Sequence, residues 1–502
     1  MPGASSPSAS KIKFEVNLGA SPRPQRQRRP RDESSPLGIL IQGDFAGSAN
    51  RAGRPPLAQR RSLAVDADNF ETVIGSLTPG VRLPATADSG EEMNLQFSSL
   101  EDFHPDALLA RLPNLKRLAE QRRRLRDPKT AAAAAEELAA LLSTPPPAAM
   151  PAAQSPPASS PKTESADETL ARLMGGAPAA QPAPKGQGLD QFIKQLVTSS
   201  AVPSATPQQT ALLSLVDLEL TNGLRAVLHH PGFQQLEATW RGADRLVRRF
   251  GGEEKVKLYI ADIAQEELAP DVGLAEFFRR QTDEHELALC LALYSFGAHA
   301  SQLNALDCLV QCTAGSGLLL LSGASPSLIG CEALEGQTAP EEWRTPLPAD
   351  VAEAWQALRD RPEAARLGLA LPRFLLRQPY GRQGEPIESF PFEELPASGA
   401  HADYLWGNPA IGCGQLIAEA FLADGWEMQL SGYGEVGDLP VHRFTSDEGK
   451  QVKPCAEAWL SERAGEAILE KGFIPLLSVK GRDAVLVPKL QSITGESLAL
   501  RF

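Results

Sequence analysis

The feature that most constrains this sequence is a stretch rich in proline, alanine, serine and glutamine at residues 143–188. Tracts such as residues 155–161, SPPASSP, cannot build a packed core and favour an extended chain. The whole chain holds 42 prolines in 502 residues, which also predicts at least one long linker. We therefore expect folded parts at residues 37–142 and 189–502, joined by a long disordered linker.

The first 36 residues contain a pattern that predicts one strand on a flexible basic arm. Residues 11–19 read KIKFEVNLG, in which apolar and polar side chains alternate as they do in a half-buried strand. The apolar positions are Ile12, Phe14, Val16 and Leu18. Residues 23–31 follow with five arginines and no acidic residue, so they cannot bury themselves. Because a single strand is unstable alone, it must pair with a sheet of this chain or of another subunit.

Strand and helix patterns alternate after residue 36 and predict an α/β fold with mixed sheets and flanking helices. Residues 37–45, LGILIQGDF, form a short apolar run typical of a buried strand. Beyond the linker, strands are expected at 256–263, 286–294 and 317–322, and helices at 211–228, 233–249, 274–280 and 300–312. This alternation implies crossover connections and a sheet covered by helices on its faces.

Capping residues and turns place the later elements, which we divide into residues 189–365 and 366–502. Asn408 followed by Pro409 is a typical helix start, and Ser461 can cap a second helix. Residues 473–479 and 484–488 predict a hairpin.

The composition argues against nucleic acid and membrane insertion. The net charge is −13 and only 6 % of the residues are aromatic, so neither a phosphate backbone nor stacked bases are favoured partners. The longest apolar stretch, residues 287–300, is too short and too interrupted to span a bilayer. The first ten residues lack the apolar core of a signal peptide. No two of the six cysteines have CxxC spacing, which favours buried thiols in a reducing cytoplasm.

The search for chemistry predicts no enzyme, metal or cofactor. His229 and His230 are adjacent, so in a helix they point about 100° apart and cannot face one metal ion together. Asp403 could orient His401 as a base, but no serine or cysteine nucleophile accompanies them. Four arginines lie on a helix expected after Pro113: Arg122, Arg123, Arg124 and Arg126. The simplest interpretation of this run is a solvated face, and the alternative is a subunit contact.

Three segments of the first part carry a specific pattern. They are residues 36–47 (PLGILIQGDFAG), 65–77 (VDADNFETVIGSL) and 95–127 (LQFSSLEDFHPDALLARLPNLKRLAEQRRRLRD). In this order they resemble the small subunit of the type VI secretion contractile sheath, called TssB or VipA. The matching positions include Gly43, Asp44 and Phe45.

Four segments of the second part carry another pattern. They are residues 229–242 (HHPGFQQLEATWRG), 369–381 (LALPRFLLRQPYG), 403–410 (DYLWGNPA) and 472–477 (GFIPLL). They resemble the large sheath subunit, called TssC or VipB. The motif residues are Trp240, Arg241, Gly242, Pro372, Arg373, Phe374, Trp406, Gly407, Asn408 and Pro409. The chain thus resembles a natural fusion of the two subunits, with both halves packed as one sheath protomer.

The resemblance implies a structural role in a contractile tube. Sheath protomers assemble around an inner tube of the protein Hcp, on a baseplate, and contract to drive effector delivery. Neighbours are tied by donated strands, and Ile12, Phe14, Val16 and Leu18 match the donated strand of the small subunit. The ATPase ClpV recognises a helix near the start of the large subunit. The candidate here lies at residues 189–197, with Leu189, Phe192, Ile193 and Leu196 on one face, although the same face also suits a core-docking helix.

Two departures from the family pattern leave the function open between alternatives. The C-terminal region of the large subunit is expected to be largely missing, and residues 275–288 are shorter than the family pattern. The first hypothesis is a cytoplasmic, non-enzymatic sheath component that polymerises with itself or with other sheath subunits. The second is a sheath-related accessory or capping protein that docks on sheath or baseplate without polymerising. The third, from another class, is a cytosolic hydrolase on an α/β sheet.

Overall fold

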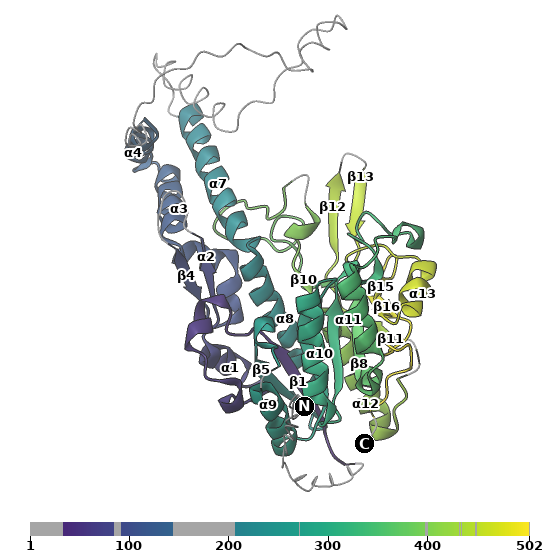
Figure 1. The fold of residues 1–502 in the computed structure, drawn as a ribbon. Coiled ribbons are helices and arrows are strands. Elements are labelled where there is room, and N and C mark those ends of the chain that lie inside the picture. Colours follow the sequence, from purple (N-terminus) through teal and green to yellow (C-terminus); the bar gives the residue numbers. More distant parts are fainter. Residues whose placement is uncertain are drawn as a thin grey trace, which may run out of the picture.

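The computed structural model describes residues 34–84, 92–143, 206–270, 272–396, 400–430, 432, 434–446 and 449–500. A seven-stranded sheet forms the centre of the molecule (Figure 1). Its strands, in spatial order, are β14 (Ile474–Pro475), β8 (Leu367–Leu371), β7 (Leu319–Ala324), β6 (Leu287–Phe296), β1 (Leu37–Gly43), β5 (Val256–Asp262) and β2 (Leu63–Val65). Only the β2–β5 pairing is antiparallel, so the sheet is mixed, as the sequence predicted.

Strand β1 lies inside this sheet, between two strands that follow it by more than two hundred residues. It runs parallel to both neighbours, with Leu37 opposite Val256 of β5 and Gly38 opposite Leu287 of β6. All seven residues of β1 are buried. The two halves of the chain therefore complete one sheet together.

The two faces of β1 contribute to two different apolar cores, because successive side chains of a strand point to opposite faces. Ile39 and Ile41 pack in the core that includes helices α8 (Pro231–Phe250) and α12 (Pro409–Asp424). Leu40 packs in the other core. That second core is covered by α9 (Val272–Glu284), α10 (Ala300–Ala314), α11 (Ala349–Arg359) and α13 (Glu462–Glu470). Helices thus cover both faces of the sheet, as the sequence predicted.

A group of helices extends away from the sheet toward the top of Figure 1. It consists of α2 (Pro105–Arg111), α3 (Pro113–Arg126), α4 (Ala131–Ser143) and α7 (Thr206–Leu228). Helix α3 packs along α7, and Arg122 of α3 forms an ion pair with Asp217 of α7. Arg122 is buried, so a solvated face is the wrong interpretation for this arginine; Arg123 and Arg126 are exposed.

Smaller elements complete the structure. In the first part of the chain these are α1 (Phe70–Leu77) and the hairpin of β3 (Gly80–Leu83) and β4 (Met93–Gln96). In the last part of the chain they are β9 (Phe374–Leu375), β10 (Trp406–Gly407), β11 (Gly434–Val436), β12 (His442–Ser446), β13 (Gly449–Lys453), β15 (Leu477–Ser478) and β16 (Val485–Val487). Strands β12 and β13 form a two-stranded hairpin of their own.

Several local predictions are confirmed, and among them is the hairpin of residues 473–479 with 484–488, whose second part forms as β15 pairs antiparallel with β16. Asn408 caps α12 by accepting a bond from the Ala410 amide at 3.0 Å, and Ser461 caps α13. Only the first strand of that hairpin differs from the prediction, because Ile474 and Pro475 form β14, which joins the main sheet beside β8. The strand expected at residues 11–19 and the helix expected at 189–197 lie outside the described residues.

Candidate functional site at the junction of the two halves

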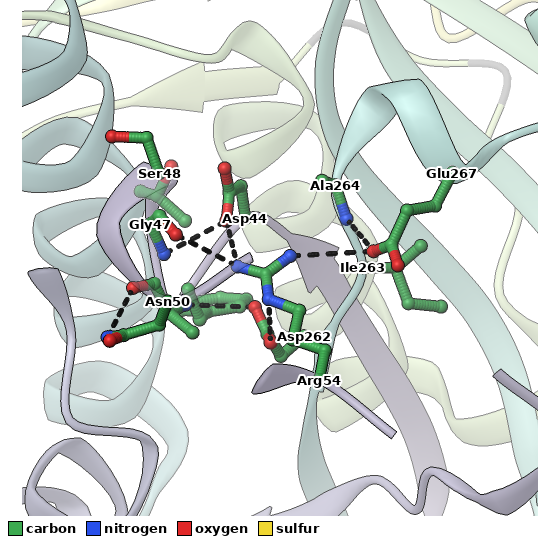
Figure 2. A network of polar contacts seen from close by, with 12 residues as sticks. Asp44, Gly47, Ser48, Asn50, Arg54, Asp262, Ile263, Ala264 and Glu267 are labelled. Atoms are coloured by element: carbon green, nitrogen blue, oxygen red, sulfur yellow. Dashed lines mark hydrogen bonds and ion pairs between the residues drawn. The ribbon is translucent and has the colours of Figure 1, made fainter. Parts of the chain in front are cut away.

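The junction begins where β1 ends, in the segment with Gly43, Asp44 and Phe45. The carboxylate of Asp44 accepts a hydrogen bond from the Gly47 amide at 2.9 Å, which holds the turn that follows β1. Gly47 has a φ of 72°, a conformation that glycine adopts without strain. The chain then forms a short 3-10 helix, Ser48–Gly53, and delivers Arg54 back to Asp44 (Figure 2).

Arg54 connects the first half to the end of strand β5. Its guanidinium contacts Asp44 and also lies 3.2 Å from a carboxylate oxygen of Asp262 and 3.4 Å from one of Glu267. Only 6 % of the Arg54 side chain is exposed. Figure 2 shows these carboxylates around the guanidinium, with the Ala264 amide bonded to Glu267. A second arginine, Arg60, also contacts Glu267, at 2.6 Å.

The pKa shifts in this cluster follow from burial and opposite charge. Burial raises the pKa of Asp262, and the nearby Arg54 opposes that rise. Burial also works to lower the pKa of Arg54, but the attraction of Asp262 and Asp44 outweighs it and raises that pKa. The cluster contains a cation fully enclosed by its counterions, an arrangement that holds two chain segments together.

Phe45 and Trp240 join the halves through apolar contact and one hydrogen bond. The indole N–H of Trp240 on α8 donates to the Phe45 carbonyl at 2.9 Å. The two rings meet edge to face, with centroids 4.9 Å apart, and Phe70 of α1 packs on the same indole at 5.9 Å. The Trp240 side chain is fully buried. Two residues singled out from separate segments of the sequence are therefore direct neighbours.

A second buried network lies within the larger half. Arg377, on the segment after β9, contacts Glu237 of α8 at 2.9 Å and Glu394 at 2.7 Å. Arg241 contacts Glu237 at 2.7 Å and donates to the Tyr380 hydroxyl at 3.2 Å. Burial alone would raise the pKa of Glu237, but Arg377 and Arg241 hold it below its usual value. The network fixes α8 against the loop that follows β9.

The remaining motif residues also have structural contacts. Gly242 lets α8 approach α12, since an added Cβ would lie 3.2 Å from Ile411. Arg373 forms an ion pair with Glu457. Besides capping α12, Asn408 donates to the Tyr294 carbonyl of β6 at 2.6 Å.

Five further motif residues lie at turns, strands and a helix start of the larger half. Pro372 directly follows β8, and Phe374 lies in β9. Trp406 and Gly407 form β10, which pairs with β9, and Pro409 opens α12. They shape the second half.

The pair His401 and Asp403 does not form the arrangement of a catalytic base with its orienting acid. Asp403 contacts His229 at 3.3 Å, whereas His401 contacts Glu457 at 3.2 Å. Over the part of the chain that the structure describes, no group of three or more histidine, cysteine or acidic residues is placed to hold a metal ion. Within the same residues, no helix has the length and apolar character to cross a membrane.

Arg54, Asp262 and Glu267 are junction residues that the sequence did not single out. Asp262 is the last residue of β5, which is otherwise largely apolar, and an acidic residue at that position is a local indication of a polar contact at the end of the strand. Arg54 sits in a stretch without clear periodicity, residues 48–62, so its partners follow only from the fold.

The fold and the junction define a two-part α/β protein whose halves interlock through one sheet. Known families correspond to each part. The sequence model described as "EvpB/VC_A0108, tail sheath N-terminal domain" (VipB) matches residues 210–494. The model described as "Type VI secretion system, VipA, VC_A0107 or Hcp2" matches residues 24–144. The chain belongs to the VipB tail sheath family and carries a VipA-like region before it.

Two curated proteins of Pseudomonas aeruginosa strain PAO1 are similar to the chain. The type VI secretion system sheath protein TssC1 is 28 % identical over 317 residues, which is 59 % of this chain and 63 % of TssC1. The sheath protein TssB1 is 27 % identical over 92 residues, or 17 % of this chain and 54 % of TssB1. The matches thus cover less than two thirds of either relative. They confirm the resemblance to a fusion of TssB-like and TssC-like sequences.

Proposed function

We propose that this protein is a structural, non-enzymatic component of the type VI secretion contractile sheath and acts in the cytoplasm. The observation that supports it is the position of β1, a VipA-like strand, between β5 and β6 of the VipB-like part. Such a shared sheet makes one mechanical unit out of both parts. The protomer then assembles around an inner tube of Hcp on a baseplate and contracts to deliver effectors.

The domain boundaries belong to the same proposal. Residues 37–142 supply the VipA-like part, residues 189–365 and 366–502 supply the VipB-like part, and residues 143–188 link them. A covalent link fixes the ratio of the halves at one to one. It also raises the effective concentration of β1 beside its partner strands.

We assign contacts between protomers to the strand that carries Ile12, Phe14, Val16 and Leu18. An acceptor must offer an unpaired strand edge, since β-augmentation adds a strand by main-chain hydrogen bonds. Among the described residues, β12 and β13 form a two-stranded sheet of their own. Val452 of β13 is 46 % exposed, which leaves apolar surface on this hairpin for a neighbour. The hairpin is therefore the candidate acceptor.

Electron microscopy of the purified protein tests the sheath role. The wild-type chain is expected to form tubes, and Phe14→Asp with Val16→Asp is expected to abolish them while leaving a folded monomer. The matched control places Lys13→Asp and Asn17→Asp on the opposite face of the same strand and should still assemble. Monomers that never form tubes but sediment with an authentic sheath would instead support the accessory or capping function. Normal tubes from the Phe14 and Val16 variant would refute strand donation.

A separate test addresses recycling by ClpV. The proposed recognition face comprises Leu189, Phe192, Ile193 and Leu196. Phe192→Asp is expected to weaken binding of ClpV in a pull-down with purified components, and Gln191→Asp on a polar position serves as its control. Equal binding by wild type and the Phe192 variant would remove this helix as the recognition element.

A further inference from the structure

Charge is divided unevenly between the two parts of the chain. Residues 1–205 hold 24 basic and 21 acidic residues, a net charge of +3, whereas residues 206–502 hold 25 basic and 41 acidic residues, a net charge of −16. Two copies of a protein with a total charge of −13 repel each other at long range. Any association between copies therefore needs local attraction strong enough to offset that repulsion.

Helix α3 presents a basic surface to solvent. It contains six basic residues and one acidic residue. Leu115 and Leu125 face the core, while Lys116, Arg117 and Arg123 are exposed. The Arg123 side chain is 79 % exposed and pairs with Glu120 of its own helix. Among the described residues, Lys116 and Arg117 have no carboxylate at ion-pair distance, so two of the three cations of this basic face are left without an ion pair there.

An acidic surface lies at the other end of the molecule. Residues 251–350 hold 16 acidic residues and five basic ones. Glu253 and Glu254 precede β5, and Glu284 and Glu286 precede β6; all four are exposed, and the exposed Lys255 and Lys257 lie beside the first pair. Because β5 and β6 both run parallel to β1, these carboxylates gather at the amino edge of the sheet. Figure 1 shows α9, which ends at Glu284, at the lower end of the molecule, and α3 near the top.

We propose that the basic face of α3, defined by Lys116, Arg117 and Arg123, docks onto the acidic amino edge of the sheet in a second copy of this chain. The two surfaces differ and lie at opposite ends, so the contact is head to tail. Such a contact does not close on itself and propagates into a filament. The inference rests on the proposed sheath function and adds to it a second contact, independent of strand donation.

Sedimentation velocity at low and high salt tests the docking. Wild type is expected to associate reversibly at low salt, with an association constant that falls as salt screens exposed charges. In the triple variant Lys116→Glu, Arg117→Glu and Arg123→Glu, the association constant is expected to fall by about tenfold or more. A reciprocal variant, Glu253→Lys, Glu254→Lys and Glu284→Lys, should lose association likewise, and an equimolar mixture of the two variants should regain it.

The control changes net charge equally but elsewhere. Arg344, Arg382 and Lys480 are exposed basic residues outside α3, and their replacement by glutamate should leave association near the wild-type value. Loss of association in this control to the same extent, or no rescue in the mixture, would overturn the docking contact. Tubes that form normally from the α3 variant would also overturn the docking contact and leave the sheath role intact. Normal tubes from the Phe14 and Val16 variant would remove strand donation and would leave the docking contact unaffected.

Discussion

Replacing Arg54 with alanine should destabilise the protein because the substitution leaves three carboxylates without their shared cation. The side chains of Asp44 and Asp262 are only 8 % and 11 % exposed, and that of Glu267 is 29 % exposed. Breaking a buried ion pair by removing one partner costs about 3–5 kcal/mol. Arg60 still contacts Glu267, so the lower end of that range, about 3 kcal/mol, is the expected loss of unfolding free energy.

The pH dependence of this loss has a definite sign. Burial already holds the pKa of folded Asp262 above its usual value, and removing Arg54 takes away the charge that opposes the rise. A carboxyl whose folded pKa exceeds its unfolded value binds its proton more readily in the folded state. The deficit of the Arg54→Ala variant should therefore be largest near neutral pH and should shrink as the pH falls through the raised folded pKa.

Urea unfolding at neutral and mildly acidic pH, followed by tryptophan fluorescence, measures both effects. Arg279→Ala is the control, because the Arg279 side chain is 64 % exposed and its pairs with Glu276 and Asp283 are solvated. That control should lose less than about 0.5 kcal/mol at either pH. The description of the cluster as a structural clamp would be refuted if the Arg54→Ala variant lost no more unfolding free energy than the control. It would also be refuted if that loss grew on acidification.

Three further substitutions or reactions probe other parts of the structure. Trp240→Phe removes the hydrogen bond to the Phe45 carbonyl but keeps an aromatic ring, and should cost about 1 kcal/mol in the same unfolding assay. Gly47→Ala puts a Cβ against the Gly80 carbonyl oxygen at a positive φ, and should cost about 2–4 kcal/mol; a loss within error of zero would contradict the turn geometry. Burial raises the pKa of Cys413 to about 12, so a thiol reagent at mildly alkaline pH should not modify this residue in the folded protein, as peptide mapping would show.

The sequence predicted the strands and helices of the main sheet well because each carries its own periodic pattern. The run at 37–45 reads as a buried strand from its apolar residues alone. Its place between β5 and β6 could not be predicted, since no local pattern says which distant strands will pair. The hairpin after residue 473 was predicted, and Leu477 pairs with β16 as expected. That Ile474 pairs separately with β8 was not predicted, for the same reason, because one apolar run continues through both short strands.

Buried charges were the other limit of sequence reasoning. A run of arginines favours a solvated face, and Arg123 follows that expectation. Arg122 does not, because its guanidinium reaches Asp217 on a helix that begins 80 residues after α3 ends and also donates to the Ser389 carbonyl at 3.0 Å. Burial of a charge depends on partners supplied by the fold, so no single-helix pattern can reveal it. The motif residues could be found because they belong to recognisable segments, but the sequence did not reveal which residues they pack against.

The contacts at the junction all specify one alignment of the two halves. A shift of β1 by one residue would exchange Leu40 with Ile39 and Ile41 between the two cores. The same shift would move Asp44 away from Arg54 and the Phe45 carbonyl away from Trp240. A single register of β1 therefore satisfies the sheet pairing, the charge cluster and the indole hydrogen bond at once, and any other register loses all three. The proposed sheath role needs this property, because load applied to one half must move the other half with it and cannot be relieved by slippage at the shared sheet.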